Sequence, residues 1–365
     1  MIVHWLILFA TVLILVVLYV MDDALRALSD RADGESALGP LRSSKRIAWA
    51  TLVLVAVLFV VPKELFEPAP PQMATYDAAG NWSGADTTRI EFLDREQREL
   101  VLYGRELIRN TAYYLGPNGT VSQQTNGMNC QNCHLDAGTK PWGNNYGAVW
   151  STYPKLRSRT GRVESVAKRV NDCFERSLNG TALDTTGHEM LAIKAYMEWL
   201  GTGIETKTKP QGSGIVDLAY LDRPADPEHG AAIFTAKCVS CHQDDGQGVK
   251  ALAGSTYQYP PLWGDHSYNI GAGLYRLSRF AGYVKNNMPQ GATWENPQLT
   301  DEEAWDVAAY VNSQQRPDRD LTGDWPKLAS KPTDHPFGPY ADAFTEAQHK
   351  YGPYRPIEEA KTSAE

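Results

Sequence analysis

The sequence predicts a mainly α-helical protein in which two tandem domains of one type follow two transmembrane helices. Three observations support this fold class. The pattern C-x-x-C-H occurs twice, at Cys130–His134 and Cys238–His242. Similar helical patterns surround the two copies, and two long uncharged runs precede them. With 365 residues, the chain is long enough for more than one domain.

A two-helix membrane anchor is expected over residues 1–66. Ile2–Met21 is an uncharged run of membrane-spanning length, and Ile47–Val61 is a shorter one. The first run lacks the basic start of a signal peptide, so we expect it to be retained. The loop between the runs carries several Lys and Arg residues, whereas the N-terminal tail has none. The positive-inside rule therefore places the loop in the cytoplasm and both chain ends outside.

Residues 67–90 are rich in Pro, Ala and Gly, which is typical of a linker. They lead from the anchor to the part of the chain that carries both cysteine motifs. The whole chain has a net charge of −8, which argues against a nucleic-acid partner.

Each C-x-x-C-H motif spaces two thiols to bond covalently to a haem and places a histidine to ligate its iron. A zinc site would need further ligand pairs nearby, and a thioredoxin-like pair would need a β-α-β context. Neither occurs around the two motifs, so we expect two covalently bound haem c groups. The residues expected to hold them are Cys130, Cys133 and His134 for the first haem, and Cys238, Cys241 and His242 for the second. Such haems are attached outside the bacterial inner membrane, so both haem domains should be periplasmic, in agreement with the predicted topology.

The two halves share a helix pattern around their motifs. Each has a glycine on a helix ahead of the motif, Gly104 or Gly230, and a tyrosine on a closing helix, Tyr196 or Tyr310. A glycine lets a second helix cross closely because no Cβ intervenes. Class I cytochromes c pair their terminal helices in this way, and both halves resemble them. The expected class I cytochrome c domains are residues 91–210 and 211–317.

The sixth iron ligand is easier to predict for the second haem. Met288-Pro289 lies after His242 and before the closing helix, where a class I cytochrome c supplies its thioether. The first half has no Met-Pro in the matching place. Instead it has Cys173, the cysteine left over from the two motifs, in a helical segment opened by Val163 and Val166.

Two arginines share a helix face with Cys173, because Arg169 is four residues before it and Arg176 three after. Neighbouring guanidinium groups favour the thiolate, which is the form that binds iron. Spacing alone does not choose between Cys173 and other ligands. The alternatives are Met190, Met197 and His188.

Four runs resemble the dihaem thiosulfate dehydrogenase family. The most specific is N-D-C-F-E-R-S-L-N-G at Asn171–Gly180, which is similar to the cysteine signature of that family. The others are similar to its second domain: P-P-L-W-G at Pro260–Gly264, N-M-P at Asn287–Pro289 and E-A-W-D-V-A at Glu303–Ala308. The resemblance covers roughly residues 90 to 320.

The resemblance implies axial ligands and a reaction. It implies His134 and Cys173 for the first haem, and His242 and Met288 for the second. The family couples two thiosulfate ions into tetrathionate with release of two electrons. Thiolate lowers and thioether raises the potential of a haem, so electrons should pass from the first haem to the second. We further expect Cys173 to leave the iron during turnover and to carry a sulfur group transiently.

Positive charge for the substrate is expected from the segment 155–176, where Lys and Arg outnumber Asp and Glu. Two dianions come together more readily in a partly dry, positively charged site. The resemblance implies Arg159, Arg169 and Ser177 as residues of this site. Most of the other basic side chains are expected on a solvated face.

Two features depart from the family. Some members have a lysine directly before the distal methionine that can replace it on redox change. Here that residue is Asn287, and the nearest lysine is Lys285. The two N-terminal spans also differ from soluble periplasmic members and suggest a protein fixed beside a membrane partner.

Two functions therefore remain open. The first is an enzyme that interconverts thiosulfate and tetrathionate. The second is a non-catalytic electron-transfer subunit of a membrane respiratory complex. The redox partner is expected to be a terminal oxidase, a quinol-oxidising complex or a soluble cytochrome c.

Residues 318–365 are rich in Pro and aromatics and are expected to form an extended C-terminal tail. His335 and His349 lie in this tail. We expect them to be solvent-facing or packed histidines rather than ligands.

Overall fold

The computed structural model describes residues 74–251 and 256–364, with residues 16, 18–20, 22–23, 26–27 and 49 of the N-terminal region. The chain divides into two compact units, Met1–Pro71 and Gln72–Glu365. The predicted spans Ile2–Met21 and Ile47–Val61 lie outside the described residues, apart from the single positions just given. Within the described part of the chain, no helix is long and apolar enough to cross a bilayer.

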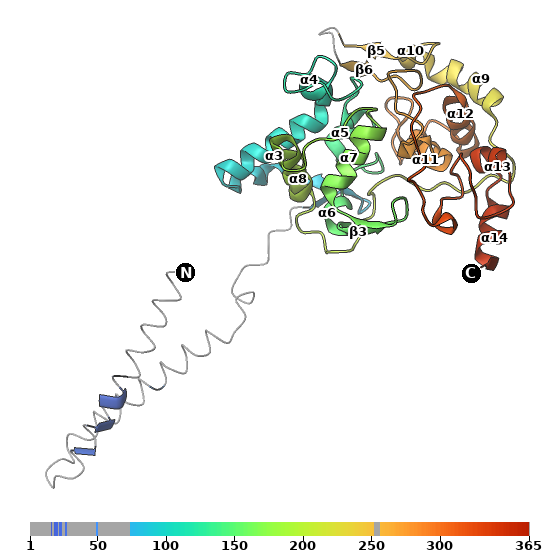
Figure 1. Cartoon of the computed structure of the whole chain (residues 1–365). Helices are drawn as coiled ribbons and strands as arrows, with labels where there is room; N and C mark the ends of the chain where they lie inside the picture. The colour runs from blue at the N-terminus through green and yellow to red at the C-terminus, as the bar shows by residue number, and fades with distance from the viewer. Residues whose placement is uncertain are drawn as a thin grey trace. The chain divides into compact units, whose positions relative to one another are not determined.

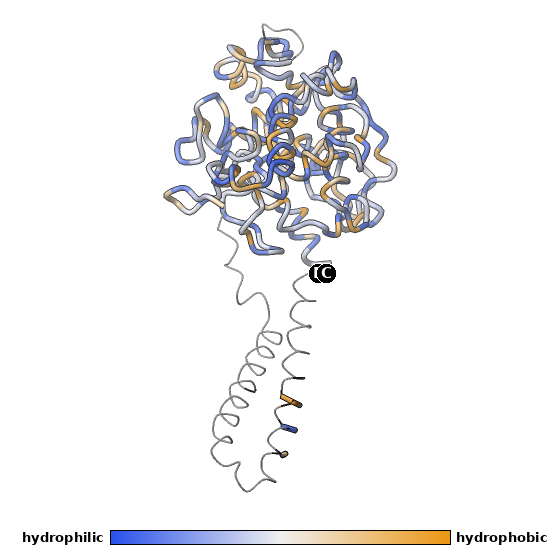
Figure 2. The backbone as a smooth tube through the Cα atoms, turned by 90° about the vertical axis from the view of Figure 1, so that its left-hand side faces the viewer, coloured by the Kyte–Doolittle hydropathy of each residue, from blue (hydrophilic) through white to orange (hydrophobic). Residues whose placement is uncertain are grey.

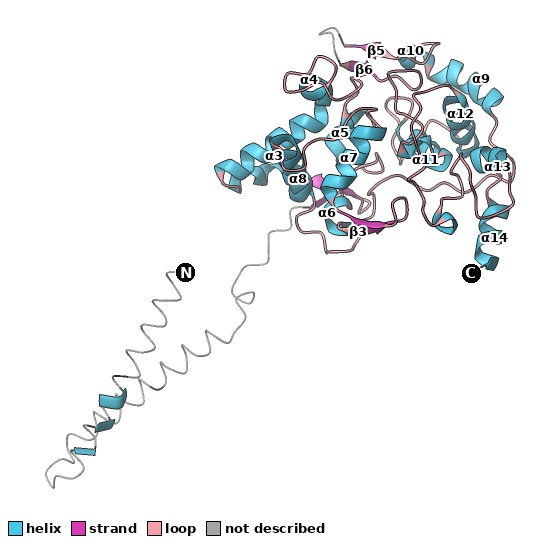
Figure 3. Ribbon diagram, viewed as in Figure 1, coloured by secondary structure: helices cyan, strands magenta, loops and turns pink. Residues whose placement is uncertain are grey.

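The second unit is mainly α-helical, as predicted, and long loops connect its helices (Figure 3). Its first half contains α3 (Arg95–Arg109), α4 (Thr111–Leu115), α5 (Leu135–Gly138), α6 (Val149–Thr152), α7 (Val166–Arg176) and α8 (His188–Leu200). Its second half contains α9 (Pro227–Lys237), α10 (Val239–His242), α11 (Leu277–Asn287) and α12 (Asp301–Ser313). Two helices follow, α13 (Glu346–Tyr351) and α14 (Arg355–Ala364).

Three antiparallel strand pairs accompany these helices. They are β1 (Ala74–Tyr76) with β2 (Trp82–Ala85), β3 (Lys155–Arg157) with β4 (Arg162–Glu164), and β5 (Val249–Lys250) with β6 (Tyr257–Tyr259). In the β3–β4 hairpin, Leu156 is opposite Val163. The expectation that Val163 opens a helix is therefore wrong. The helix begins only at Val166, because the Ser165 hydroxyl accepts a hydrogen bond from the Lys168 N–H at 3.2 Å and caps it.

The two haem domains share one helix crossing, as the sequence pattern predicted. A Cβ built on Gly104 of α3 would lie 2.0 Å from the Ala192 carbonyl oxygen and 2.9 Å from Cβ of Tyr196 on α8. A Cβ on Gly230 of α9 would lie 2.0 Å from the Asp306 carbonyl oxygen and 2.9 Å from Cβ of Tyr310 on α12. Only glycine permits such an approach. Figure 1 shows the pair α3–α8 on one side of this unit and α9–α12 on the other.

Buried side chains form the core of this unit, and Trp82, Phe174, Phe234 and Trp305 are among the largest fully buried ones. Figure 2 shows the matching alternation of hydrophobic and hydrophilic stretches along its helices. Phe174 belongs to α7, which carries Cys173, and Phe234 belongs to α9, which leads to Cys238.

Two hydrogen bonds tie the second domain to the loop of the first haem motif. The Tyr283 hydroxyl donates to the Asn132 carbonyl oxygen at 3.0 Å, and Asn287 Nδ2 donates to the Trp142 carbonyl oxygen at 3.2 Å. Both donors lie on α11, and both are buried. The helix that leads to Met288 is therefore fixed against the first haem motif.

The C-terminal tail is only partly extended, because it contains α13 and α14. We expected an extended chain because Pro and aromatic residues interrupt the helical pattern. Local stretches nonetheless become helical where Tyr354 and Ile357 are buried. His335 and His349 are also buried. Both ring nitrogens of His349 have partners, since Nδ1 lies 2.7 Å from the Thr333 carbonyl oxygen and Nε2 lies 3.0 Å from Asp342.

Candidate functional site

The first C-x-x-C-H motif is held against α4. The Cys130 N–H donates to the Thr111 hydroxyl at 3.0 Å, and Asn129 Oδ1 accepts from the Ala112 N–H at 2.8 Å. Thr111 and Ala112 form the first turn of α4. These bonds fix the start of the motif, so that Cys133 and His134 follow in a defined direction.

Both motif histidines are oriented by a backbone carbonyl. Nδ1 of His134 contacts the Asn144 carbonyl oxygen, and Nδ1 of His242 lies 3.0 Å from that of Pro260. Burial lowers the pKa of His134 to about 4 and also lowers that of His242. Both rings are therefore neutral at pH 7 and keep Nε2 for another partner. A carbonyl on the second nitrogen is the usual support of a histidine that ligates a metal, so the residues fit a haem iron.

A cavity of about 480 Å³ brings the predicted residues of the first domain together. The motif residues Cys130, Cys133 and His134 line it. The predicted substrate residues also line it, namely Cys173, Arg159, Arg169 and Ser177. The second domain contributes residues from 268 to 279. The site therefore lies between the two haem domains.

Cys173 is on α7, where Arg169 Nη1 lies 3.2 Å from its Sγ. The electrostatic interaction with Cys173 is the main cause that raises the pKa of Arg169. The second arginine expected beside the thiol behaves differently. Arg176 forms a bidentate ion pair with Asp324, at 2.7 and 2.8 Å. Of the two arginines on this helix face, Arg169 therefore contacts the sulfur, whereas Arg176 pairs with a carboxylate that is distant in the sequence.

The other candidates for the sixth ligand of the first haem differ in position. Met197 lines the cavity, as Cys173 does. His188 is exposed and stacks on Tyr103 with ring centroids 5.1 Å apart. Met190 is fully buried on α8 and is not among the residues that line the cavity. Only Cys173 has a cation in contact with its sulfur among these residues.

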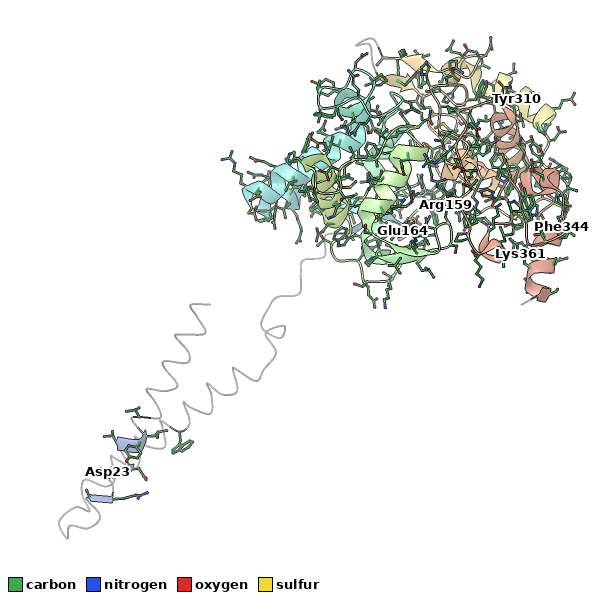
Figure 4. All side chains as sticks on the ribbon, viewed as in Figure 1. Asp23, Arg159, Glu164, Tyr310, Phe344 and Lys361 are labelled. Atoms are coloured by element: carbon green, nitrogen blue, oxygen red, sulfur yellow. The ribbon has the colours of Figure 1, made fainter. Side chains whose placement is uncertain are left out.

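Arg159 lies in the turn of the β3–β4 hairpin, and Figure 4 labels it together with Glu164 of β4. Its Nη1 donates to the Gly271 carbonyl oxygen at 2.8 Å, and its Nε lies 4.0 Å from Asp324. Burial is the main cause that lowers the pKa of Arg159 to about 10, and Arg176 adds to this effect. The guanidinium remains charged at pH 7.

Two residues of the C-terminal tail lie at the site, although the sequence did not predict a role for them. Asp324 contacts Arg176 and Arg159, and Trp325 lines the cavity. Both belong to the tail, whose composition gave no indication of a role. They reach the site across more than a hundred residues of sequence, and only the tertiary fold brings them there.

Several basic residues of the segment 155–176 already have acidic partners. Arg157 lies 3.9 Å from Glu164, and Lys168 contacts Asp172 directly. Among the arginines of the segment that line the cavity, Arg176 has a bidentate carboxylate partner, whereas Arg157, Arg159 and Arg169 do not.

The second site is built around Cys238, Cys241 and His242, with Met288 directly after α11. The Tyr259 ring lies edge-on to His242 with centroids 6.5 Å apart, and its hydroxyl donates to Gln290 at 3.4 Å. Tyr259 thus connects the histidine to the loop of Met288.

The residues beside Met288 are engaged elsewhere. Nδ2 of the buried Asn287 donates to two carbonyl oxygens, those of Tyr283 and Trp142. Lys285 Nζ donates to the Leu299 carbonyl oxygen and pairs with Asp301, both at 2.7 Å.

Comparison with protein families identifies both domains. The family described as "SoxA/TsdA, cytochrome c domain" matches residues 120–205, and the family described as "Cytochrome c" matches residues 227–315. Each match includes one C-x-x-C-H motif. The chain therefore contains two cytochrome c domains.

Several characterised proteins are similar over much of the chain. A thiosulfate dehydrogenase of Stutzerimonas stutzeri is 39% identical over 222 residues, which are 60% of this chain and 68% of that protein. A thiosulfate dehydrogenase of Allochromatium vinosum is 40% identical over 196 residues, which are 53% of this chain and 71% of that protein. The structure of "Thiosulfate dehydrogenase (TsdBA)" from Marichromatium purpuratum superposes with a TM-score of 0.60 at 33% identity. It covers 66% of this chain and 50% of that chain.

Proposed function

Because the chain belongs to the thiosulfate dehydrogenase family of dihaem c-type cytochromes, and is an oxidoreductase of that type with two covalently bound haems, we propose that it oxidises thiosulfate to tetrathionate. The reaction takes place in the cavity of the first haem domain. One observation carries the proposal: Arg169 Nη1 lies 3.2 Å from Cys173 Sγ, in the cavity that also holds His134. A sulfur held by a cation beside a haem-binding histidine suits sulfur redox chemistry.

His134 and Cys173 are the proposed axial ligands of the first haem, and His242 and Met288 those of the second. The contacts of both histidine Nδ1 atoms with carbonyl oxygens support their role. When bound, the haems would supply two one-electron acceptors, and a thiolate ligand would give the first the lower potential, so that electrons would pass from the first site to the second.

Three residues are proposed to bind the substrate. Arg159 and Arg169 supply positive charge to thiosulfate dianions, and the Ser177 hydroxyl supplies a hydrogen bond. Charge-assisted bonds of this kind are stronger in a site that excludes water. Residues from both domains surround the cavity, which supports this exclusion.

Cys173 is proposed to carry sulfur between two thiosulfate ions. Its thiolate and the terminal sulfur of one thiosulfate form an S–S bond and lose two electrons, which the two haems would accept when bound. A second thiosulfate then attacks the thiosulfate-derived sulfur of this bond, releasing tetrathionate and restoring the Cys173 thiolate. Charge and atoms balance without a proton transfer.

The protein is proposed to act at the bacterial inner membrane, with two spans and both haem domains in the periplasm. The uncharged runs of the first 66 residues and the basic loop between them support this location. Electrons would then leave the second haem for a membrane-bound or soluble respiratory acceptor. Recovery of the full-length protein in the salt-washed membrane fraction tests the location, and recovery in the soluble periplasm would contradict it.

A reduction assay tests the activity. Thiosulfate is added to the oxidised, purified dihaem protein, and haem reduction and tetrathionate formation are followed. We expect Cys173→Gly and Arg169→Gln to slow both by about a hundredfold or more. Arg162→Gln is the matched control, because Arg162 is an exposed arginine of the same segment. If wild-type haems stay oxidised with thiosulfate yet accept electrons from a quinol-oxidising complex, the non-catalytic electron-transfer function is correct instead.

A further inference from the structure

Part of the C-terminal tail completes the wall of the first haem site. We call residues 318–337 the strap. In the strap, Asp324 accepts two short hydrogen bonds from Arg176, one at Oδ1 from Nη2 at 2.7 Å and one at Oδ2 from Nη1 at 2.8 Å. The pair is buried, with side-chain exposures of 9% for Arg176 and 8% for Asp324. Arg176 itself lines the cavity.

The strap also holds the hairpin turn that carries Arg159. The Trp325 N–H donates to the Arg159 carbonyl oxygen at 2.6 Å, and the guanidinium lies 5.6 Å from the centre of the indole ring. A Cβ on Gly161 of the same turn would lie 3.0 Å from Pro326. Both the backbone and the side chain of Arg159 therefore depend on the strap for their position.

Gly271 of the second domain brings the two guanidinium groups together. Its carbonyl oxygen accepts from Arg159 Nη1 at 2.8 Å and from Arg176 Nη1 at 3.4 Å. A Cβ at this position would lie 2.7 Å from Arg176 Nη1. Two like charges therefore approach one another here, and Asp324 is the carboxylate in contact with both. Without a counter-charge such a pair is unfavourable in a buried site.

From these contacts we propose that Asp324 is a positioning residue that limits the anion affinity of the cavity by neutralising Arg176 and holding it away from the substrate. Arg159 and Arg169 then bind the dianions, while the Arg176–Asp324 pair contributes no net charge. The inference rests on the proposed function for the identity of the substrate. The reaction ends with release of a dianionic product, and a cavity with one more free arginine would retain anions more strongly.

Sulfate provides a test that does not require turnover, because it is a dianion that resembles thiosulfate and is not oxidised. Its affinity for the oxidised dihaem protein is measured by calorimetry at pH 7 and low salt. We expect Asp324→Asn to bind sulfate at least about tenfold more tightly, because the cavity gains one positive charge. Asp320→Asn is the control, since Asp320 is exposed and its carboxylate accepts a hydrogen bond from the Thr322 N–H at 2.9 Å. We expect it to bind as wild type does.

A double-mutant cycle separates charge balance from mere structure. Arg176→Gln should weaken sulfate binding at least about tenfold, because it leaves Asp324 without its cation. The double variant Asp324→Asn/Arg176→Gln should return to within about threefold of wild type. Weaker binding by both single variants, or by the double variant, would show that the pair only supports the fold and would overturn the proposal. Haem content and thermal unfolding of each variant are recorded, so that a misfolded variant is recognised. If a single variant misfolds, the sulfate affinity of the double variant still tests the proposal.

The two proposals can fail separately. If wild type does not oxidise thiosulfate but the sulfate affinities change as expected, the proposed reaction is wrong and the role of Asp324 holds. If wild type oxidises thiosulfate and Asp324→Asn binds sulfate no more tightly, the role of Asp324 is wrong and the reaction holds. With turnover intact, Asp324→Asn should also lower the KM for thiosulfate, whereas a purely structural defect would raise KM or lower kcat alone.

Discussion

Replacing Gly230 by alanine is expected to separate the two helices that frame the second haem. The new Cβ would lie 2.0 Å from the Asp306 carbonyl oxygen, whereas ordinary contacts begin at 3.4 Å. Helices α9 and α12 must therefore move apart by about 1.4 Å at their crossing, since the opposing atom is backbone and cannot rotate away. Interiors packed to crystal density do not absorb such a shift without losing contacts.

The expected cost follows from two opposing effects. Overpacking a well-filled crossing costs about 3 kcal/mol, at the upper end of its usual range. Alanine in a helix interior regains up to about 1 kcal/mol relative to glycine. The free energy of unfolding should then fall by about 2 kcal/mol, which lowers Tm by about 3 °C in a unit that runs from Gln72 to Glu365.

Thermal unfolding of the holoprotein, followed by haem absorbance and far-UV circular dichroism, measures this change. Gly323→Ala is the control, because Gly323 is exposed and no atom lies within 4 Å of its Cβ position. We expect its Tm to remain within about 1 °C of wild type. A Gly230→Ala protein that melts with the control would refute the close crossing and, with it, the repeated packing of the two domains.

Three further outcomes are expected. Burial lowers the pKa of His335 to about 4, whereas the unfolded chain has a pKa of about 6.5 at this residue. The unfolded chain therefore binds the proton first, and the free energy of unfolding falls as the pH drops from about 6.5 to 4. The loss is about 2.5 kcal/mol at pH 4.5. Tm measured against pH should show a shallower acid loss in His335→Gln, and equal slopes would contradict the burial argument. Asp306→Ala should lower the free energy of unfolding by about 3 kcal/mol, because the fully buried carboxylate accepts hydrogen bonds from Arg223 at 2.8 and 2.9 Å. Urea unfolding measures this free energy, and a decrease of less than about 1 kcal/mol would contradict the prediction. Tyr283→Phe should cost about 1 kcal/mol in the same assay, because the Asn132 carbonyl oxygen loses its buried donor; no loss would mean that water replaces the hydroxyl.

Local sequence patterns were sufficient to predict the helix pairing and the haem motifs. Gly104 and Gly230 could be recognised because a glycine and a tyrosine at matching places in two halves report a helix crossing directly. The C-x-x-C-H motifs needed only spacing. The contact of Arg169 with Cys173 also followed from helix periodicity, since the two residues are one turn apart.

Long-range contacts could not be predicted from the sequence. Periodicity placed Arg176 beside Cys173 as well, but the bidentate geometry of Asp324 attracts it more strongly. Asp324 lies 148 residues further along the chain, and nothing in its local sequence indicates which cation it meets. The β3–β4 hairpin was missed for another reason, because strands of three residues are too short to show an alternating pattern.

The two hydrogen bonds between the second domain and the loop of the first haem motif determine which of their positions can accept substitutions. The donors at that boundary are side chains, Tyr283 and Asn287, whereas the acceptors are the main-chain oxygens of Asn132 and Trp142. Every amino acid offers a carbonyl oxygen, so these two bonds require no particular residue at 132 or 142, whereas they require donors at 283 and 287. Asn132 is constrained separately, because its Oδ1 accepts a hydrogen bond from the Asn129 N–H at 2.7 Å. Relatives that keep these two hydrogen bonds should therefore retain side-chain donors at the positions of Tyr283 and Asn287, whereas the bonds themselves place no demand on the side chains at the acceptor positions.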